Sequence, residues 1–445
     1  MISVSPMRTL RGSVRIPPSK PHCQRALILA TLAKGASEIH NMNTCTETQV
    51  IAEASQAFGA TLQWQNESLK IRGVGGHLRQ PRRVLCVEGS GFALRNILAM
   101  ASLVDGSTIL TGDKNLGRRP HQPLIDRLSE LGVCIEPLEP QQALPLINWG
   151  GGLMGGSISI PVETTSQFAT ALMLVAPYAA DTVVLHLVGE MVGKEYVHLS
   201  LDLMREFGAT VFASEDLQEI EIHNEGYRAR NITIGPDVTS LFSFIAAAVV
   251  VDTNIHIEDV HLGSDPLQDE AIAIGRRLGV QVYQTAHGVR ILSGSPPTKR
   301  VELHVAHVPT LVPALTAIAC RLPHGMRLTG AQHIRFHKTS RLETLMAELE
   351  KLNYSFTPIY KGDVIDGFEA AFITGTSAQV DTVDSHGDHR LFMALFLACL
   401  QLAEPTSILG EETLVASFPE FVDRFTALGA AGQRFEAPNS ISTSA

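Results

Sequence analysis

Apolar and polar positions along the chain repeat with a long period. Six times, a segment with helical apolar periodicity ends in Leu or Phe, reaches a Gly or Asn and runs into β-type residues, as in "SQAFGATLQW" and "MREFGATVFA". Gly or Asn directly after a helix is typical of a left-handed C-cap, where the chain turns toward a strand. Six such residues follow one another at intervals of 71 to 76 positions: Gly59, Gly132, Gly208, Gly279, Asn353 and Gly429. The pattern predicts six structural repeats.

A second kind of segment alternates with the first. It is rich in small apolar residues and is followed by a polar turn and a strand, as in "ALRNILAMASLVDGSTILTG" and "FMALFLACLQLAEPTSILG". The turns recur every 71 to 79 positions: Gly35, Gly106, Asp181, Asp252, Gly325 and Glu404. A helix that is apolar on all sides must be buried on all sides. We therefore expect six helix–strand–helix–strand units in two compact lobes, with the apolar helices inside and the sheets outside.

The starts of the apolar helices carry the candidate chemistry. A buried helix start has unpaired N–H groups and favours an anion. Lys20 and Arg25 begin the first such helix, "PPSKPHCQRALILATLAKG", although cations are better placed at helix C-termini. That stretch contains no carboxylate, so we expect both side chains to face an external anion. The candidate residues at or near the other helix starts are Gly91, Arg95, Arg119, Thr165, Ser166, Gln167, Lys338, Arg341, Asp388, His389 and Arg390.

Each of these features also has an ordinary interpretation. A lone Arg near a helix start is usually a surface residue or an ion-pair partner, and Thr-Ser-Gln is usually an N-cap. The triplet Asp388-His389-Arg390 can be a cap with an internal ion pair. Their recurrence at equivalent points of the repeat favours a shared site instead. Arg and Lys in such numbers suit one or two phosphates and a carboxylate.

Composition limits the functional classes. The 445 residues predict two or more domains, and 45% hydrophobic with 18% charged residues indicates a globular protein with a large core. A net charge of −10 argues against a nucleic-acid or membrane partner. The six cysteines lie far apart without a metal-binding spacing, so we expect reduced thiols and no metal. Without a signal-like start or an uncharged stretch of membrane-spanning length, the sequence predicts a cytoplasmic protein.

Several motifs resemble, in order and over nearly the whole chain, those of the EPSP synthase (3-phosphoshikimate 1-carboxyvinyltransferase) family. They include "GSGFALRNILAM", "TSQFATALML", "KTSRLETLMAELEKL" and "DSHGDHRLFMALFLACL". The resemblance implies an α/β fold, a two-domain inside-out α/β barrel of six βαβαββ repeats joined by two crossover strands. We expect lobe I to comprise residues 1–20 and 236–445, and lobe II residues 21–235.

The resemblance also implies an activity and a partner class. Family members transfer the carboxyvinyl group of phosphoenolpyruvate (PEP) to a hydroxyl of shikimate 3-phosphate, in the shikimate pathway of aromatic amino acid biosynthesis. They use no metal or organic cofactor. We accordingly expect small anionic substrates, namely PEP and a phosphorylated carboxylate, no cofactor, and a monomer.

The resemblance assigns residues to the two substrates. The positions implied for PEP are Lys20, Gly91, Arg119, Gln167, Arg341 and Arg390. The positions implied for the acceptor are Lys20, Arg25, Thr165, Ser166 and Gln167. Arg95, Tyr196, Thr310, Asp388 and His389 are expected in the same site. The candidate catalytic residues are Lys20, His337, Lys338 and Arg390.

The chain departs from the family pattern where protons are transferred. Thr310 stands in place of the general base, an Asp, and Lys338 in place of the acid, a Glu; His337 and Ala416 replace two lysines. Each lost acid–base group typically costs 10²–10⁴-fold in rate. Three functions stay open: a divergent carboxyvinyl transferase, a repurposed homologue that performs elimination or phosphate loss, and a non-catalytic anion-binding protein.

Overall fold

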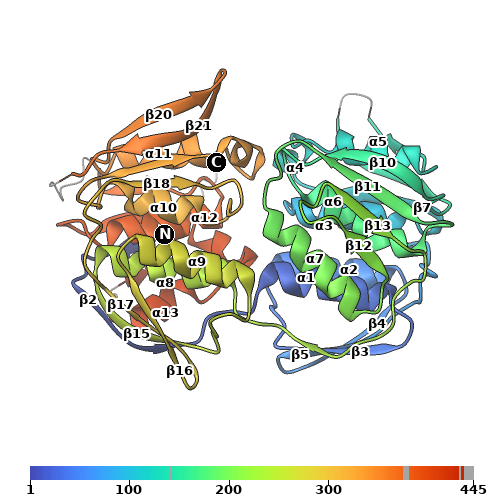
Figure 1. Ribbon diagram of the computed structural model, residues 1–445, viewed down its shortest axis with the longest axis horizontal. Helices are drawn as coiled ribbons and strands as arrows, with labels where there is room; N and C mark the ends of the chain where they lie inside the picture. Colours follow the sequence, from blue (N-terminus) through green and yellow to red (C-terminus); the bar gives the residue numbers. More distant parts are fainter. Residues whose placement is uncertain (140–141, 374–379, 430–431, 435–445) are drawn as a thin grey trace, which may run out of the picture.

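The computed structural model describes residues 1–139, 142–373, 380–429 and 432–434, which form two lobes side by side (Figure 1). Each lobe has its own hydrophobic core. The core of lobe II draws on residues 23–234, and that of lobe I on residues 2–16 and 238–428. These cores support the expected division near residues 20 and 236, whose exact boundaries stay a prediction.

In the described part of the chain, six four-stranded sheets, three in each lobe, confirm the predicted repeat. In each of these sheets one outer strand is parallel to its neighbour and the other neighbouring pairs are antiparallel, for example β10-β11-β13-β12. Lobe II comprises α1 (Lys20–Leu32), β3 (Ala36–His40), α2 (Thr46–Ala57), β4 (Thr61–Gln65), β5 (Ser68–Arg72), β6 (Leu85–Cys86), α3 (Gly91–Ala101), β7 (Asp105–Thr111), α4 (Lys114–Gly117), α5 (Gln122–Glu130), β8 (Ile135–Pro137), β9 (Leu146–Gly150), β10 (Gly156–Pro161), α6 (Gln167–Val175), η1 (Ala176–Tyr178), β11 (Val183–Val188), α7 (Lys194–Glu206), β12 (Val211–Ala213), β13 (Glu219–Ile222) and β14 (Ile232–Thr233).

Lobe I contains both ends of the described chain (Figure 1). It comprises β1 (Ile2–Val4), β2 (Thr9–Val14), α8 (Val238–Val250), β15 (Asp252–Glu258), α9 (Pro266–Arg277), β16 (Gln281–Thr285), β17 (Gly288–Leu292), β18 (Val301–His304), α10 (Val312–Ala319), β19 (Met326–Thr329), η2 (Gln332–Phe336), α11 (Arg341–Glu350), β20 (Phe356–Lys361), β21 (Val364–Ala370), β22 (Thr382–Asp384), α12 (His389–Cys399), β23 (Thr406–Leu409), η3 (Glu411–Ala416), α13 (Phe421–Ala427) and β24 (Gly432–Arg434).

The chain crosses between the lobes twice, and the two connections run together. Strand β2 completes the sheet of β15, whereas β14, more than 200 residues later, completes the sheet of β3. Between them, the Ser19 N–H donates to the Gly235 carbonyl at 2.8 Å, and the Asp237 N–H donates to the Pro17 carbonyl at 2.9 Å. Because these connections are paired, α1 and α8 begin side by side at the boundary between the lobes.

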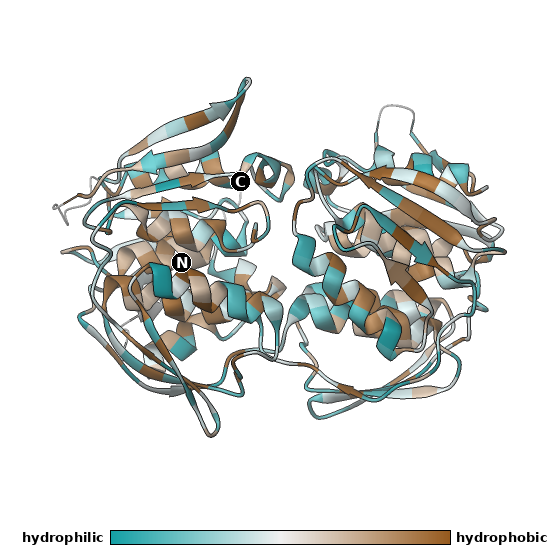
Figure 2. Cartoon of the chain, viewed as in Figure 1, coloured by the Kyte–Doolittle hydropathy of each residue, from teal (hydrophilic) through white to brown (hydrophobic). Residues whose placement is uncertain are grey.

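The helices divide as the sequence predicts. Every residue of α3 and of α12 is buried, and apolar helices fill the interior of each lobe while strands cover the outside (Figures 1 and 2). Amphipathic helices such as α5 bury only one side. The six marker residues after the helices all have positive φ: Gly59, Gly132, Gly208, Gly279, Asn353 and Gly429. The predicted left-handed turns are therefore confirmed. Within the described ranges, no helix combines the length and apolarity of a membrane span.

Candidate functional site

Five helices begin at one pocket between the lobes. Their first residues line it together: Lys20 (α1), Gly91 (α3), Gln167 (α6), Arg341 (α11) and His389 (α12). Helix starts present free N–H groups and the positive end of the helix dipole, so the pocket favours an anion before any side chain is considered. Of the predicted site residues, the pocket also takes in Arg25, Arg95, Arg119, Thr165, Ser166, Tyr196, Thr310, His337, Lys338 and Arg390.

The predicted residues thus meet, with the exception of Asp388, which is fully buried behind the pocket wall. Their roles in binding and catalysis stay predictions. Seven of the lining side chains are cations, and they come from both lobes: Lys20, Arg25, Arg95, Arg119, Lys338, Arg341 and Arg390.

Arg25 is held in place entirely by lobe II. Its Nε donates to the Ser200 hydroxyl at 2.8 Å, and its Nη1 donates to the Pro21 carbonyl at 3.0 Å. The guanidinium also lies over the Phe92 ring at 4.9 Å, where a cation–π contact stabilises it. Burial lowers the pKa of Arg25 to about 10, so the group remains charged at neutral pH.

Arg95 orients Gln167 toward the pocket. Its Nη1 donates to Gln167 Oε1 at 2.5 Å, its Nη2 donates to the Pro120 carbonyl at 3.2 Å, and its guanidinium lies over Phe168 at 5.0 Å. Burial and the nearby Arg119 lower the pKa of Arg95 to about 9. With its amide oxygen used in this way, Gln167 has its N–H₂ group left to donate to a ligand.

Arg119 is the cation that protein groups satisfy least. Its Nε and Nη2 atoms are buried and have no hydrogen-bond partner among the described residues. Gly91 makes room for it, because a Cβ there would lie 3.1 Å from Arg119 Nη1 and 3.4 Å from Arg95 Nη1. Buried polar groups are nearly always paired. An unpaired guanidinium facing a pocket therefore indicates a ligand with acceptor oxygens.

Asp388 fixes the lobe I wall. Arg341 donates to both of its carboxylate oxygens, from Nε at 2.6 Å and from Nη2 at 3.1 Å, and the Arg390 backbone N–H donates to Asp388 at 2.9 Å. Burial by itself raises the pKa of Asp388, but the Arg341 charge and these hydrogen bonds outweigh it and hold the pKa below its ordinary value. Asp388 therefore positions Arg341 and caps α12 from behind the pocket wall.

The two imidazoles of the pocket are neutral. Burial is the main cause, and it holds both pKa values well below the ordinary value. Nearby cations add to the effect, chiefly Arg341 at His337 and Lys20 at His389. His337 Nδ1 accepts from Arg341 Nη1 at 2.9 Å, which leaves the ring proton on Nε2. Both ring nitrogens of His389 are buried without a partner in the described part of the chain.

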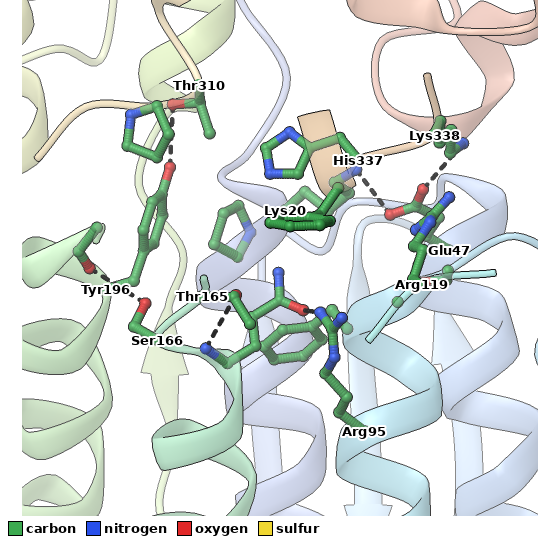
Figure 3. Close-up of a pocket in the computed structure, with 18 of the residues that line it drawn as sticks. Lys20, Glu47, Arg95, Arg119, Thr165, Ser166, Tyr196, Thr310, His337 and Lys338 are labelled. Atoms are coloured by element: carbon green, nitrogen blue, oxygen red, sulfur yellow. Dashed lines mark hydrogen bonds and ion pairs between the residues drawn. The ribbon is translucent and has the colours of Figure 1, made fainter. Parts of the chain in front are cut away.

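Lys20 was expected to face an external anion because its own stretch contains no carboxylate, but another part of the chain supplies one. Its Nζ lies 2.8 Å from Oε2 of Glu47, and Lys338 Nζ lies 3.3 Å from Oε1 of the same carboxylate (Figure 3). Glu47 comes from the first turn of α2, which packs beside α1. Sequence reasoning missed it because it considered only the apolar helix starts, whereas the available signal was an acidic residue in the first turn of the helix that follows.

Thr310 and Tyr196 close the pocket across the lobes. Their hydroxyl oxygens lie 3.1 Å apart, and Arg390 Nη1 donates to the Thr310 carbonyl at 3.4 Å (Figure 3). Burial raises the pKa of Tyr196, so both hydroxyls are neutral. At this point the pocket offers hydrogen bonds but no base.

Comparisons with known proteins agree with this geometry. The sequence profile of "EPSP synthase (3-phosphoshikimate 1-carboxyvinyltransferase)" matches residues 4–425. The 3-phosphoshikimate 1-carboxyvinyltransferase of Methanothermobacter thermautotrophicus is 33% identical over 96% of this chain and 98% of its own length. The chain belongs to the EPSP synthase family.

Solved structures agree on the fold. EPSP synthase from Acinetobacter baumannii matches with a TM-score of 0.78 at 22% identity, covering 97% of this chain and 99% of its own. The enolpyruvyl transferase NikO from Streptomyces tendae matches with a TM-score of 0.76 at 18% identity, covering 98% and 99%. The predicted family, transferase class and two-lobed α/β fold are confirmed. This member of the EPSP synthase family has a pocket lined by the seven cations and by an unexpected carboxylate, Glu47.

Proposed function

We propose that this pocket transfers the carboxyvinyl group of PEP to a hydroxyl of a phosphorylated cyclic hydroxy acid such as shikimate 3-phosphate. The proposal rests mainly on Arg119, because two of its buried nitrogens have no hydrogen-bond partner among the described residues. Arg119 is one of seven cations that line this pocket. Leaving buried cations unpaired is costly. A ligand pair that brings two phosphates and two carboxylates supplies the missing charge.

The geometry supports a division of the pocket between the two substrates. Arg119 lies against Gly91, and Arg341 and Arg390 line the same pocket from lobe I; we assign PEP, through its carboxylate and phosphate, to these three cations. Arg25 and the start of α6, with Thr165 and Ser166, form the other wall, where the acceptor phosphate would bind. We also propose that the protein acts as a monomer.

The chemistry adds the acceptor oxygen to C2 of PEP and a proton to C3, while the acceptor hydroxyl gives its own proton to the phosphate group of PEP. The intermediate then loses a C3 proton, and the C2–O bond to phosphate breaks to release inorganic phosphate. Fixed orientation of the two substrates supplies much of the rate, because it replaces the entropy of a two-molecule encounter. Thr310 cannot act as a base near neutral pH, so this residue contributes orientation only.

The test is to incubate the protein with PEP and shikimate 3-phosphate, measuring phosphate release and the mass of the product. We expect phosphate and a joined carboxyvinyl product in equal amounts. Arg119→Met should lower kcat/KM at least about tenfold, because it removes charge-assisted hydrogen bonds to the substrate. Its exposed neighbour offers the matched control, and Arg118→Met should behave as wild type.

The other outcomes separate the remaining functions. Phosphate release without a joined product would replace the proposal with a repurposed enzyme. Stabilisation of the fold by PEP without any turnover would leave an anion-binding protein. The ammonium of Lys338, at the position of the family's acid, is the observation that favours these alternatives.

A further inference from the structure

Glu47 is the only carboxylate among the described residues that line the pocket. Its side chain is 15% exposed and lies between Lys20, at the start of α1, and Lys338, which follows η2 in the opposite lobe (Figure 3). One carboxylate oxygen serves each lysine. The carboxylate is thus fixed in orientation between two of the seven pocket cations.

The surroundings of Glu47 come from four elements. Lys20 lies on α1, Lys338 after η2, Arg119 after α4, and Cys45 just before α2 itself. Thr413, Val415 and Ala416 of η3 add no charge to the second, adjoining cavity that Glu47 also lines. The titratable groups on the far side of that cavity are Glu88, Asp113 and His386.

The protonation of Glu47 depends on what its lysines bind. Burial raises the pKa of Glu47, but Lys20 and Lys338 outweigh it and bring the pKa to about 2. The same two ammonium groups are the ones that a substrate phosphate or carboxylate would engage in the pocket. An anion there shares their charge and faces the carboxylate with a like charge, and both effects favour the protonated form.

We propose that Glu47 is the catalytic carboxylate of this enzyme, which takes up a proton when an anionic enol substrate engages Lys20 and Lys338 and exchanges that proton with the substrate methylene. This inference rests on the proposed function and names its proton-transfer group. In the addition step the O–H bond of protonated Glu47 breaks and its proton forms a C–H bond at C3. The acceptor oxygen bonds to C2, and its hydroxyl proton passes to the phosphate group of PEP. In the elimination step the carboxylate removes one C3 proton as the C2–O bond to phosphate breaks.

Other groups in the pocket are less suited to this step. Lys338 is a cation bonded to Glu47, and the Nδ1 of His337 accepts from Arg341. Tyr196 is a buried neutral phenol paired with Thr310. His389 is the remaining competitor, because its ring nitrogens are unpartnered and would also gain basicity beside a bound anion.

The experiment follows deuterium into the methylene. PEP and shikimate 3-phosphate are incubated in D₂O, and nuclear magnetic resonance measures deuterium at C3 of PEP and product while phosphate release is recorded. Wild type should incorporate deuterium. Glu47→Gln should lower both incorporation and phosphate release by about 10²–10⁴-fold, while the Kd for PEP changes less than about tenfold. Glu47→Asp, which keeps the carboxylate, should retain measurable incorporation.

Two further variants show whether the loss of deuterium incorporation is due to Glu47 itself. Glu53 lies on the same helix, is exposed and pairs with Arg83, so Glu53→Gln should match wild type. His389→Asn tests the competing imidazole and should lose less deuterium incorporation than Glu47→Gln. Loss of incorporation in His389→Asn together with its retention in Glu47→Gln would transfer the role to His389 and overturn the proposal.

The remaining outcomes separate this inference from the proposed function. If wild type is active and Glu47→Gln stays within about threefold of it, the inference fails alone. If wild type binds PEP but releases no phosphate with shikimate 3-phosphate, the proposed function and the inference fail together.

Discussion

Two carboxylates of lobe II each bind two basic side chains, at least one of which belongs to lobe I. Glu47 binds Lys20 and Lys338, and Glu190 binds His304 at 3.2 Å and Lys361 at 3.5 Å. Their surroundings differ: the Glu47 side chain is 15% exposed and that of Glu190 is 52% exposed. Glu47 lies at the pocket, whereas Glu190 lies at a neighbouring solvent-accessible cavity between the lobes.

The difference shows that burial, and not contact geometry, decides what an ion pair does. Water and salt screen the charges around Glu190, so such pairs contribute little to stability. The charges around Glu47 are largely desolvated, so each depends on the others, and removing one leaves an uncompensated charge. Only the Glu47 cluster can therefore couple its protonation to a bound anion.

The largest expected effect on stability is that of Glu47→Gln. Loss of the carboxylate leaves Lys20 and Lys338 facing each other without compensation, which costs on the order of 3 kcal/mol in the free energy of unfolding. Urea denaturation at neutral pH measures this cost, with Glu190→Gln as the matched variant. Equal losses in the two variants would show that burial does not separate the two bridges.

The pH dependence of stability sharpens the same contrast. The pKa of Glu47 is lowered to about 2 in the folded protein from an ordinary value near 4.5. Its contribution is therefore complete above about pH 4.5 and is lost as the pH falls toward 2. The stability difference between wild type and Glu47→Gln should shrink in this window, as measured by denaturation at pH 6, 4 and 3. A difference that is constant over that range would mean that Glu47 has no lowered pKa.

Thr310 and Lys338 replace the family's general base and general acid, and substitutions at these two positions should change turnover in opposite directions. Thr310→Asp places a carboxylate beside the Tyr196 hydroxyl and near Arg390, and should raise turnover about tenfold by supplying a base. Lys338→Glu should lower turnover, because it sets a second carboxylate against Glu47. Steady-state phosphate release with PEP and shikimate 3-phosphate measures both. A gain in Lys338→Glu would show that the lysine, and not Glu47, limits proton transfer.

The smallest expected effect concerns the exposed bridge. Glu190→Gln should change the free energy of unfolding by less than about 1 kcal/mol, and the change should diminish further at high salt. Denaturation at 0.05 M and 0.5 M sodium chloride tests this. A large, salt-independent loss would place Glu190 in the same class as Glu47.

The sequence allowed the repeated framework and most of the pocket to be predicted, because both have local signatures. The left-handed turns after the helices need Gly or Asn, and the cations stand directly at helix starts. Glu47 could not be assigned in this way, because its place in the pocket depends on α2 packing beside α1. It depends also on Lys338, which belongs to the other lobe. Arg25 was assigned to the site, but its hydrogen-bond partner Ser200 could not be predicted, since it lies 175 residues away along the chain.

The relative turnover of Glu47→Gln and Glu190→Gln, measured as kcat for phosphate release from PEP and shikimate 3-phosphate, tests the central claim most directly. Both variants remove one carboxylate from a bridge between the lobes, so any general effect of loosening the lobes is shared. The account predicts that Glu47→Gln retains at most about 1% of the wild-type kcat, whereas Glu190→Gln retains nearly all of it. Equal rates in the two variants would contradict it.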